Sequence, residues 1–180
     1  DTSTFDFTPE KFDESTFLPK TLKGFSREDL NLKIFNNIFA SKTSDIARMI
    51  YLGLSHNNKV RNVLEIGTGS GWQSALLSKI YHRVYTIEID REAYLFSSNI
   101  LKNISNKISH KHGDGKLGWI DAGPFDAIYI DCCLEQEPEY LYSNLVKDEG
   151  VLVAANKYDN KQYYCSCLPH SGKGLVKSNY

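Results

Sequence analysis

The stretch from Val63 to Gly71 constrains the fold of this chain more than any other. It reads VLEIGTGSG, a short apolar run that ends in three glycines at alternate positions, Gly67, Gly69 and Gly71. Glycine allows backbone turns that are closed to other residues, and it lets a ligand approach the main chain without a Cβ in the way. The stretch therefore predicts a buried strand that ends in a ligand-binding loop and leads into a helix.

Glu65 narrows the choice of ligand, because it lies at the carboxyl end of the predicted strand, just before the first glycine. A carboxylate there is badly placed for a pyrophosphate but well placed for an ammonium group, and an NAD site would need the Gly-x-Gly-x-x-Gly spacing. We predict S-adenosyl-L-methionine, a nucleoside with a cationic amino-acid tail, bound by Glu65, Gly67, Thr68, Gly69 and Gly71. The alternative is a strand-turn-helix junction whose glycines bind nothing.

Strands and helices are expected to alternate along the rest of the chain. Strands are predicted at 83–89, 107–111, 125–130, 151–155 and 161–167, and helices at 72–80, 91–103 and 139–146. Such alternation requires a parallel sheet covered on both faces. The expected fold is α/β, a doubly wound, mostly parallel, Rossmann-like sheet with helices on both faces and the ligand outside the carboxyl ends of the strands.

Two further acids follow the next two predicted strands. Glu88 ends one strand 21 positions after Gly67, about where an acid holds the ribose hydroxyls of a bound nucleoside. Asp90 is the fallback, although it is better placed to cap the next helix. Asp114, followed by Gly115, is predicted to accept a hydrogen bond from the exocyclic amine of adenine, while its flanking glycines keep side chains off the ring.

The first 42 residues are expected to be an N-terminal arm on the substrate side, and residues 43–180 to be the cofactor-binding domain, a single globular unit. The arm carries aromatic residues without a regular period, at Phe5, Phe7, Phe12 and Phe17. Leu30, Ile34 and Ile38 recur every four residues and indicate a helix, which Asn36 and Asn37 weaken. A second helix, capped by a hydroxyl in Thr43-Ser44-Asp45, is expected over the cofactor end of the sheet.

Composition removes several classes of function. The 21 basic residues nearly balance the 22 acidic ones, so the chain has no field that would hold a nucleic acid or an anionic membrane. No apolar stretch reaches a membrane-spanning length, and the start has no signal peptide, so a cytoplasmic location is expected. The absence of an initiator methionine suggests a fragment or a processed chain.

No metal site is expected from the four cysteines. They fall as Cys132-Cys133 and Cys165-x-Cys167, and a four-thiolate zinc site would normally show two residues between paired ligands. Buried thiols in a reducing compartment, behaving as small apolar side chains, are the alternative.

Over roughly residues 45–153, the sequence resembles the protein-L-isoaspartate O-methyltransferase family of class I methyltransferases. The resemblance is carried by ARM at 47–49, VLEIGTGSGWQ at 63–73, VYTIE at 84–88, GDG at 113–115 and PFDAI at 124–128. It implies S-adenosyl-L-methionine as the cofactor and, as the substrate, a peptide or protein carboxylate of an isoaspartyl or aspartyl side chain. The implied role is protein repair or peptide modification.

Two departures from the family bear on the substrate. The family's Gly-Gln-Thr-Ile-Ser stretch, which helps to hold the substrate carboxylate, aligns with residues 37–41, where only Ser41 is kept. Ser41 is therefore the candidate catalytic residue that orients the acceptor, with a plain helix-start serine as the alternative. After the strand at 125–130 the family has small apolar residues, whereas this chain has Asp131-Cys132-Cys133. A specialised peptide target would fit this change.

Methylation of a carboxylate needs little acid–base help, so catalysis would depend mainly on positioning. One rival is a metal-dependent small-molecule O-methyltransferase that binds magnesium through Asp131 and Asn156. Ala155 occupies the place of its second acid, which leaves two protein ligands where about three would be expected. The other rival is a cofactor-binding module without turnover.

Overall fold

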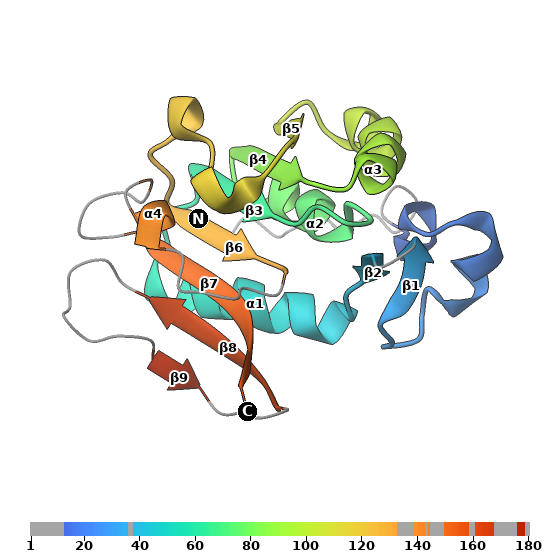
Figure 1. Cartoon of the computed structure of the whole chain (residues 1–180), viewed down its shortest axis with the longest axis horizontal. Helices are drawn as coiled ribbons and strands as arrows, with labels where there is room; N and C mark the ends of the chain where they lie inside the picture. The colour runs from blue at the N-terminus through green and yellow to red at the C-terminus, as the bar shows by residue number, and fades with distance from the viewer. Residues whose placement is uncertain are drawn as a thin grey trace, which may run out of the picture.

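The computed structural model of the chain describes residues 13–35, 38–132, 139–142, 144, 150–158, 161–167 and 176–178. At 139, 142, 155–158, 161–167 and 176–178 it describes the backbone only. The described strands form a large sheet and a small two-stranded sheet (Figure 1). The large sheet contains β3 (Asn62–Ile66), β4 (Arg83–Glu88), β5 (Ile108–His112), β6 (Ala127–Ile130), β7 (Val151–Tyr158), β8 (Lys161–Cys167) and β9 (Val176–Ser178).

The spatial order of the large sheet is β5-β4-β3-β6-β7-β8-β9. The pairs from β5 to β7 are parallel, while β8 and β9 are added antiparallel at one edge. From β3 the chain proceeds through β4 to β5 on one side, and then returns to place β6 and β7 on the other side. The carboxyl ends of β3 and β6 therefore lie at a topological switch point, where doubly wound sheets bind ligands.

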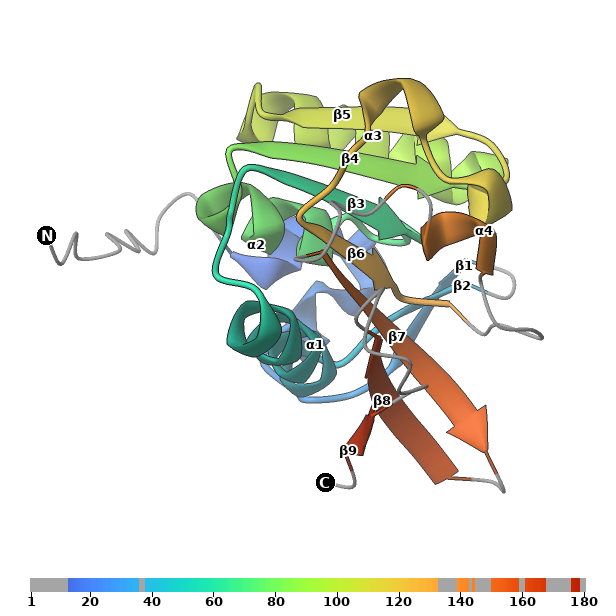
Figure 2. The ribbon, with the colours of Figure 1, turned by 90° about the vertical axis from the view of Figure 1, so that its left-hand side faces the viewer.

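Helices cover both faces of this sheet (Figure 2). The α-helices are α1 (Thr43–His56), α2 (Trp72–Ile80), α3 (Arg91–Ile104) and α4 (Glu139–Tyr142), and the 3-10 helices are η1 (Glu14–Phe17), η2 (Lys20–Phe25), η3 (Gly115–Leu117) and η4 (Ile120–Ala122). Successive residues of β3 point to opposite faces, so Val63 packs against α1 and α2, whereas Leu64 packs with Leu141 of α4. The predicted doubly wound fold is confirmed.

The helix predicted through Leu30, Ile34 and Ile38 is wrong, because this part of the chain forms the antiparallel pair β1 (Leu32–Phe35) and β2 (Ile38–Ala40). Side chains four residues apart lie on the same face of a helix, and they also lie on the same face of a strand, because side chains alternate between the two faces of a strand. Ile34 and Ala40 are buried together with Leu18 of the arm, and isoleucine favours strands. Tertiary burial therefore decided between two structures that the pattern allowed.

The helix predicted at Thr43 begins there, but its expected hydroxyl cap is absent: the N-cap residue is Lys42, whose side chain makes no capping bond. The Thr43 hydroxyl instead accepts a hydrogen bond from Trp72 Nε1 at 3.2 Å. Ser44 donates to the carboxylate of Asp29 through its amide at 3.0 Å and its hydroxyl at 2.6 Å. These bonds hold the start of α1 between α2 and the arm.

The arm packs onto the domain through an aromatic side chain, as its composition predicts. Phe17 is fully buried, and its ring centroid lies 5.2 Å from that of Trp72. Phe5, Phe7 and Phe12 lie outside the described residues, and so does Asn37. Of the helix predicted at 139–146, the structure describes only residues 139–142 and 144.

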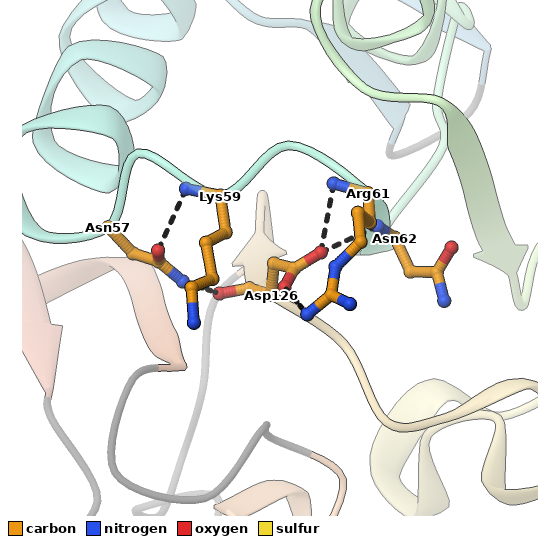
Figure 3. A network of polar contacts seen from close by, with 5 residues as sticks. All are labelled: Asn57, Lys59, Arg61, Asn62 and Asp126. Carbon is orange, nitrogen blue, oxygen red and sulfur yellow. Dashed lines mark hydrogen bonds and ion pairs between the residues drawn. The ribbon is translucent and has the colours of Figure 1, made fainter.

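A polar network at the amino ends of β3 and β6 is centred on Asp126 (Figure 3). The buried Asp126 carboxylate accepts from the amides of Arg61 at 2.9 Å and Asn62 at 2.8 Å. Asn57 donates from its side chain to the Asp126 carbonyl at 2.9 Å and accepts from the Lys59 amide at 2.9 Å. This network satisfies backbone groups at the end of the sheet opposite the glycine loop, and it joins the connection after α1 to the two central strands.

Candidate functional site

The glycine loop after β3 has the backbone that the sequence predicts. Gly67, Gly69 and Gly71 have φ angles of 92°, 53° and 87°, in the left-handed region that favours glycine. A Cβ on Gly67 would lie 2.9 Å from the backbone carbonyl oxygen of Asp131, which follows β6. The Asp131 amide donates to the carbonyl of Ile66 at 3.0 Å, so the residues after β3 and β6 are in contact at the switch point.

Glu88 fixes the glycine loop to the end of β4. Its buried carboxylate accepts from the Gly69 amide at 2.8 Å and from the Asp90 amide at 2.9 Å. A carboxylate has about four acceptor positions, so it retains capacity for ribose hydroxyls. Asp90 accepts from the Ala93 amide at 2.9 Å and caps α3, which confirms the capping role expected for it. The ribose role of Glu88 stays a prediction.

Glu65 lies in the interior beneath the loop, on the face of the sheet that packs against α2. Its Oε2 accepts hydrogen bonds from the hydroxyls of Ser74 and Thr86, while Oε1 is buried with no hydrogen-bond partner. Burial raises the pKa of Glu65 to about 8, aided by the carboxylates of Asp131 and Glu88 and opposed by the two hydroxyl bonds. Burial thus favours the neutral acid in the cofactor-free chain, and the predicted contact of Glu65 with an ammonium group stays a prediction.

Thr68 extends this chain of hydroxyls. Its Oγ1 lies 2.6 Å from that of Thr86, and the Thr68 side chain is buried. Because Thr86 donates to Glu65, the Thr68 hydroxyl donates to Thr86. The side chain of Thr68 thus supports the loop from below and leaves the backbone as its means of contacting a cofactor.

Asp114 and Gly115 lie at the end of β5, next to Glu88. The Gly113 amide donates to the Glu88 carbonyl at 2.9 Å, which joins the two strand ends. The exposed Asp114 carboxylate accepts from the Lys116 amide at 2.9 Å and caps η3. A Cβ on Gly115 would overlap the Ile66 side chain, so packing against β3 requires glycine here. The predicted adenine contacts of Asp114 and Gly115 stay predictions.

Ser41 lies in the short connection between β2 and α1, outside the strand ends that carry Glu65, Glu88 and Asp114. Its hydroxyl donates to Asp131 Oδ2 at 2.8 Å. The Phe39 carbonyl oxygen lies 3.6 Å from the place where a Cβ on Gly69 would be, so β2 runs along the glycine loop. The structure thus brings the candidate acceptor residue to the candidate cofactor loop.

Asp131 was considered from the sequence only as a magnesium ligand and as a departure from the family, and its contact with Ser41 was missed. Burial raises the pKa of Asp131, the hydrogen bond from Ser41 lowers it, and the Asp45 carboxylate raises it. An acid directly after a buried strand is the signal that could have placed it in the site.

The metal alternatives find no support in the described side chains, which contain no group of three or more His, Cys, Asp and Glu residues that could hold an ion. The side chains of Ala155, Asn156, Cys133, Cys165 and Cys167 lie outside that description. No helix in the described part of the chain is both long and apolar enough to cross a bilayer.

Two curated relatives bear the same name. The protein-L-isoaspartate O-methyltransferase of Pseudoalteromonas atlantica is 33% identical over 160 residues, which covers 88% of this chain and 74% of the relative. The protein of the same name from Helicobacter pylori strain G27 is 34% identical over 155 residues, which covers 85% of this chain and 72% of the relative.

Solved structures share the fold. A protein-L-isoaspartate O-methyltransferase matches with a TM-score of 0.78 at 20% identity, over 93% of this chain and 56% of that chain. A Plasmodium falciparum protein of the same description, in complex with S-adenosyl-L-homocysteine, matches with a TM-score of 0.71 at 18% identity, over 95% of this chain and 83% of that chain.

The family model of protein-L-isoaspartate(D-aspartate) O-methyltransferase matches residues 8–178. This match covers nearly all of the chain, and the resemblance noted in the glycine loop and the following strands is confirmed. The chain belongs to the protein-L-isoaspartate(D-aspartate) O-methyltransferase family.

Proposed function

We propose that this chain is an S-adenosyl-L-methionine-dependent methyltransferase that esterifies the free carboxylate of an isoaspartyl or aspartyl residue in a peptide or protein. The observation that carries the proposal is the position of Ser41, whose hydroxyl bonds to Asp131 beside the glycine loop. This places a hydrogen-bond donor suited to a carboxylate next to the loop that would hold the methyl donor. The names of the curated relatives support the same substrate class.

The residues present fit the cofactor. Oε1 of Glu65 is buried without a hydrogen-bond partner, and an ammonium group placed there would displace the proton of Glu65, hold it as the anion and satisfy that oxygen. Glu88 would bind the ribose hydroxyls, the backbone of the Gly67–Gly71 loop would contact the amino-acid tail, and Asp114 would bind the adenine amine. When bound, the cofactor supplies an electrophilic methyl group on a positively charged sulfur.

The chain's own contribution would be orientation and exclusion of water. An aspartyl-type carboxylate is already ionised near neutral pH, since its ordinary pKa is about 3.9, so no general base is required. The Ser41 hydroxyl would donate to one acceptor oxygen and fix the direction in which the other oxygen attacks. Correct placement of two reactants can account for a large part of the acceleration of such a reaction.

The test follows radiolabel from the methyl group of S-adenosyl-L-methionine to an isoaspartyl peptide. Esters are labile to base, so the label is expected to leave as methanol on mild alkaline treatment. Label that survives alkali would identify an amine, ring-oxygen or carbon acceptor and refute the proposal. Cofactor binding without any transfer to carboxyl peptides would favour a non-catalytic module.

Ser41 is tested by replacement with alanine. Ser41→Ala should lower kcat while leaving cofactor affinity nearly unchanged, because a residue that contacts only the acceptor contributes to the transition state and not to cofactor binding. Ser55→Ala is the matched control, since the Ser55 hydroxyl donates to the Leu52 carbonyl at 2.9 Å within α1. Equal turnover of the two variants would remove Ser41 from the mechanism.

A further inference from the structure

Asp131 occupies the side of the site where the acceptor carboxylate must bind. Its carboxylate already accepts the Ser41 hydroxyl at 2.8 Å, which is the donor proposed for the substrate. Its backbone carbonyl lies against Gly67, and the hydrogen bond from Ser41 holds its carboxylate on the acceptor side of the glycine loop. An anionic Asp131 and an anionic acceptor would therefore compete for the same hydroxyl and repel each other.

The carboxylate of Asp45 strengthens this conflict, because its negative charge raises the pKa of Asp131. Asp45 belongs to α1, while Glu65, beneath the loop on β3, is itself held as the neutral acid by burial and by the carboxylates of Asp131 and Glu88. The half-exposed guanidinium of Arg48 lies 3.6 Å from the Asp45 carboxylate and so pairs with Asp45. Proton binding is therefore a way to remove the charge of Asp131 within the described part of the chain.

Resting on the proposed function, we propose that Asp131 is a specificity-determining residue that admits a carboxylate acceptor only when it is itself neutral. As the acid, Asp131 donates its proton in a hydrogen bond to one acceptor oxygen, and Ser41 turns to the ionised acceptor. As the anion, Asp131 retains the Ser41 hydroxyl and excludes the acceptor. Charge-assisted hydrogen bonds are about twice as strong as neutral ones, which favours this exchange of partners.

The raised pKa of Asp131 is consistent with this assignment, since burial favours the neutral acid. The productive complex then needs one ionised carboxyl, that of the substrate, and one protonated carboxyl, that of Asp131. Such a pair gives a bell-shaped pH profile. Above the pKa of Asp131, kcat/KM for a carboxylate peptide should fall about tenfold per pH unit, because a single proton is lost.

The first experiment measures kcat/KM for the alkali-labile methylation of an isoaspartyl peptide from about pH 5 to about pH 9. Asp131→Asn is nearly isosteric, keeps an N–H donor and is neutral at every pH. It should flatten the alkaline limb of the wild-type profile and raise kcat/KM at high pH. Asp121→Asn changes an exposed acid in η4 and should leave the limb in place. An alkaline limb that persists in Asp131→Asn overturns the inference.

The second experiment needs no variant and no turnover. Binding of the same peptide to the wild-type protein with S-adenosyl-L-homocysteine is measured by calorimetry at about pH 5.5 and about pH 8.5. The carboxylate peptide should bind more tightly at the lower pH, while a peptide with isoasparagine in its place should bind equally at both. Equal binding of the carboxylate peptide at both pH values overturns the inference.

The two experiments separate failure of the inference from failure of the proposed function. Ester formation with an unchanged pH profile refutes only the role of Asp131. No ester from either protein at any pH, in protein that binds S-adenosyl-L-homocysteine, refutes the proposed function and the inference with it.

Discussion

Replacing Glu65 with glutamine tests how the interior beneath the glycine loop is organised. Glu65 is fully buried, shares one oxygen between Ser74 and Thr86, and leaves its other oxygen without a partner. Its pKa is raised from 4.5 to about 8, chiefly by burial. Glutamine keeps a carbonyl oxygen for the two hydroxyls and carries no titratable proton, so it imitates the protonated acid.

The sign of the effect on stability follows from proton binding. Between pH 4.5 and about 8 the folded protein keeps the Glu65 proton and the unfolded chain releases it. The unfolded state then binds fewer protons, so stability falls as pH rises. The contribution of Glu65 is fully present below its unfolded pKa and is lost as pH rises through the folded pKa. At about 1.4 kcal/mol per pH unit, the loss over this window is at most about 5 kcal/mol.

The assay is urea unfolding of wild type and Glu65→Gln at several pH values from about 5 to about 8.5, with linear extrapolation to water. The two proteins should have similar free energies of unfolding at the low end, and the variant should be several kcal/mol more stable at the high end. Titrating groups that do not interact with Glu65 cancel in the difference, whereas the coupled carboxyls of Asp131 and Glu88 do not cancel fully. Glu92→Gln, at an exposed position of α3, controls for the change in net charge. A difference that does not vary with pH would refute the buried proton.

Three further predictions test the site, the scaffold and the metal alternative. Glu88→Ala should weaken S-adenosyl-L-homocysteine binding by about 1.5–3 kcal/mol in calorimetry, because it removes charge-assisted hydrogen bonds. Affinity equal to that of wild type would exclude Glu88 from the site. Asp126→Ala should cost about 2–5 kcal/mol of unfolding free energy, since it leaves two backbone amides without their acceptor, whereas Arg61→Ala loses only a long ion pair, at 3.7 Å, whose guanidinium is exposed and which is worth about 1 kcal/mol or less. Extensive chelation should leave methyl transfer unchanged, and recovery by magnesium after a loss would support the metal-dependent rival.

Strand β3, the glycine loop and helix α2 could be predicted because their signals are local. The apolar run before Gly67 ends in a loop that needs left-handed glycines, and the helix expected at 72–80 is α2, Trp72–Ile80. Glu88 could be placed at the end of β4 for the same reason, since its distance from the loop in sequence is that of one strand-helix-strand unit.

The arm before α1 could not be predicted in the same way. The spacing of Leu30, Ile34 and Ile38 suits either a helix or a strand, and burial of Ile34 with Leu18 settled the choice. Thr43 and Ser44, one of whose hydroxyls was expected to cap α1, form side-chain hydrogen bonds with other elements instead, and no local pattern distinguishes these uses.

The sequence by itself determined the fold class, the family and the glycine loop, because periodicity, turn chemistry and motif spacing are properties of neighbouring residues. Only the tertiary structure decided that Ser41 bonds to Asp131, 90 positions away, and that Glu65 lies deep enough to keep its proton. Both depend on which strand ends meet at the switch point and on how much water is excluded there. Hydrogen-bond partners and pKa values are set by this three-dimensional surrounding, so they differ from what a residue's type and place in the sequence suggest.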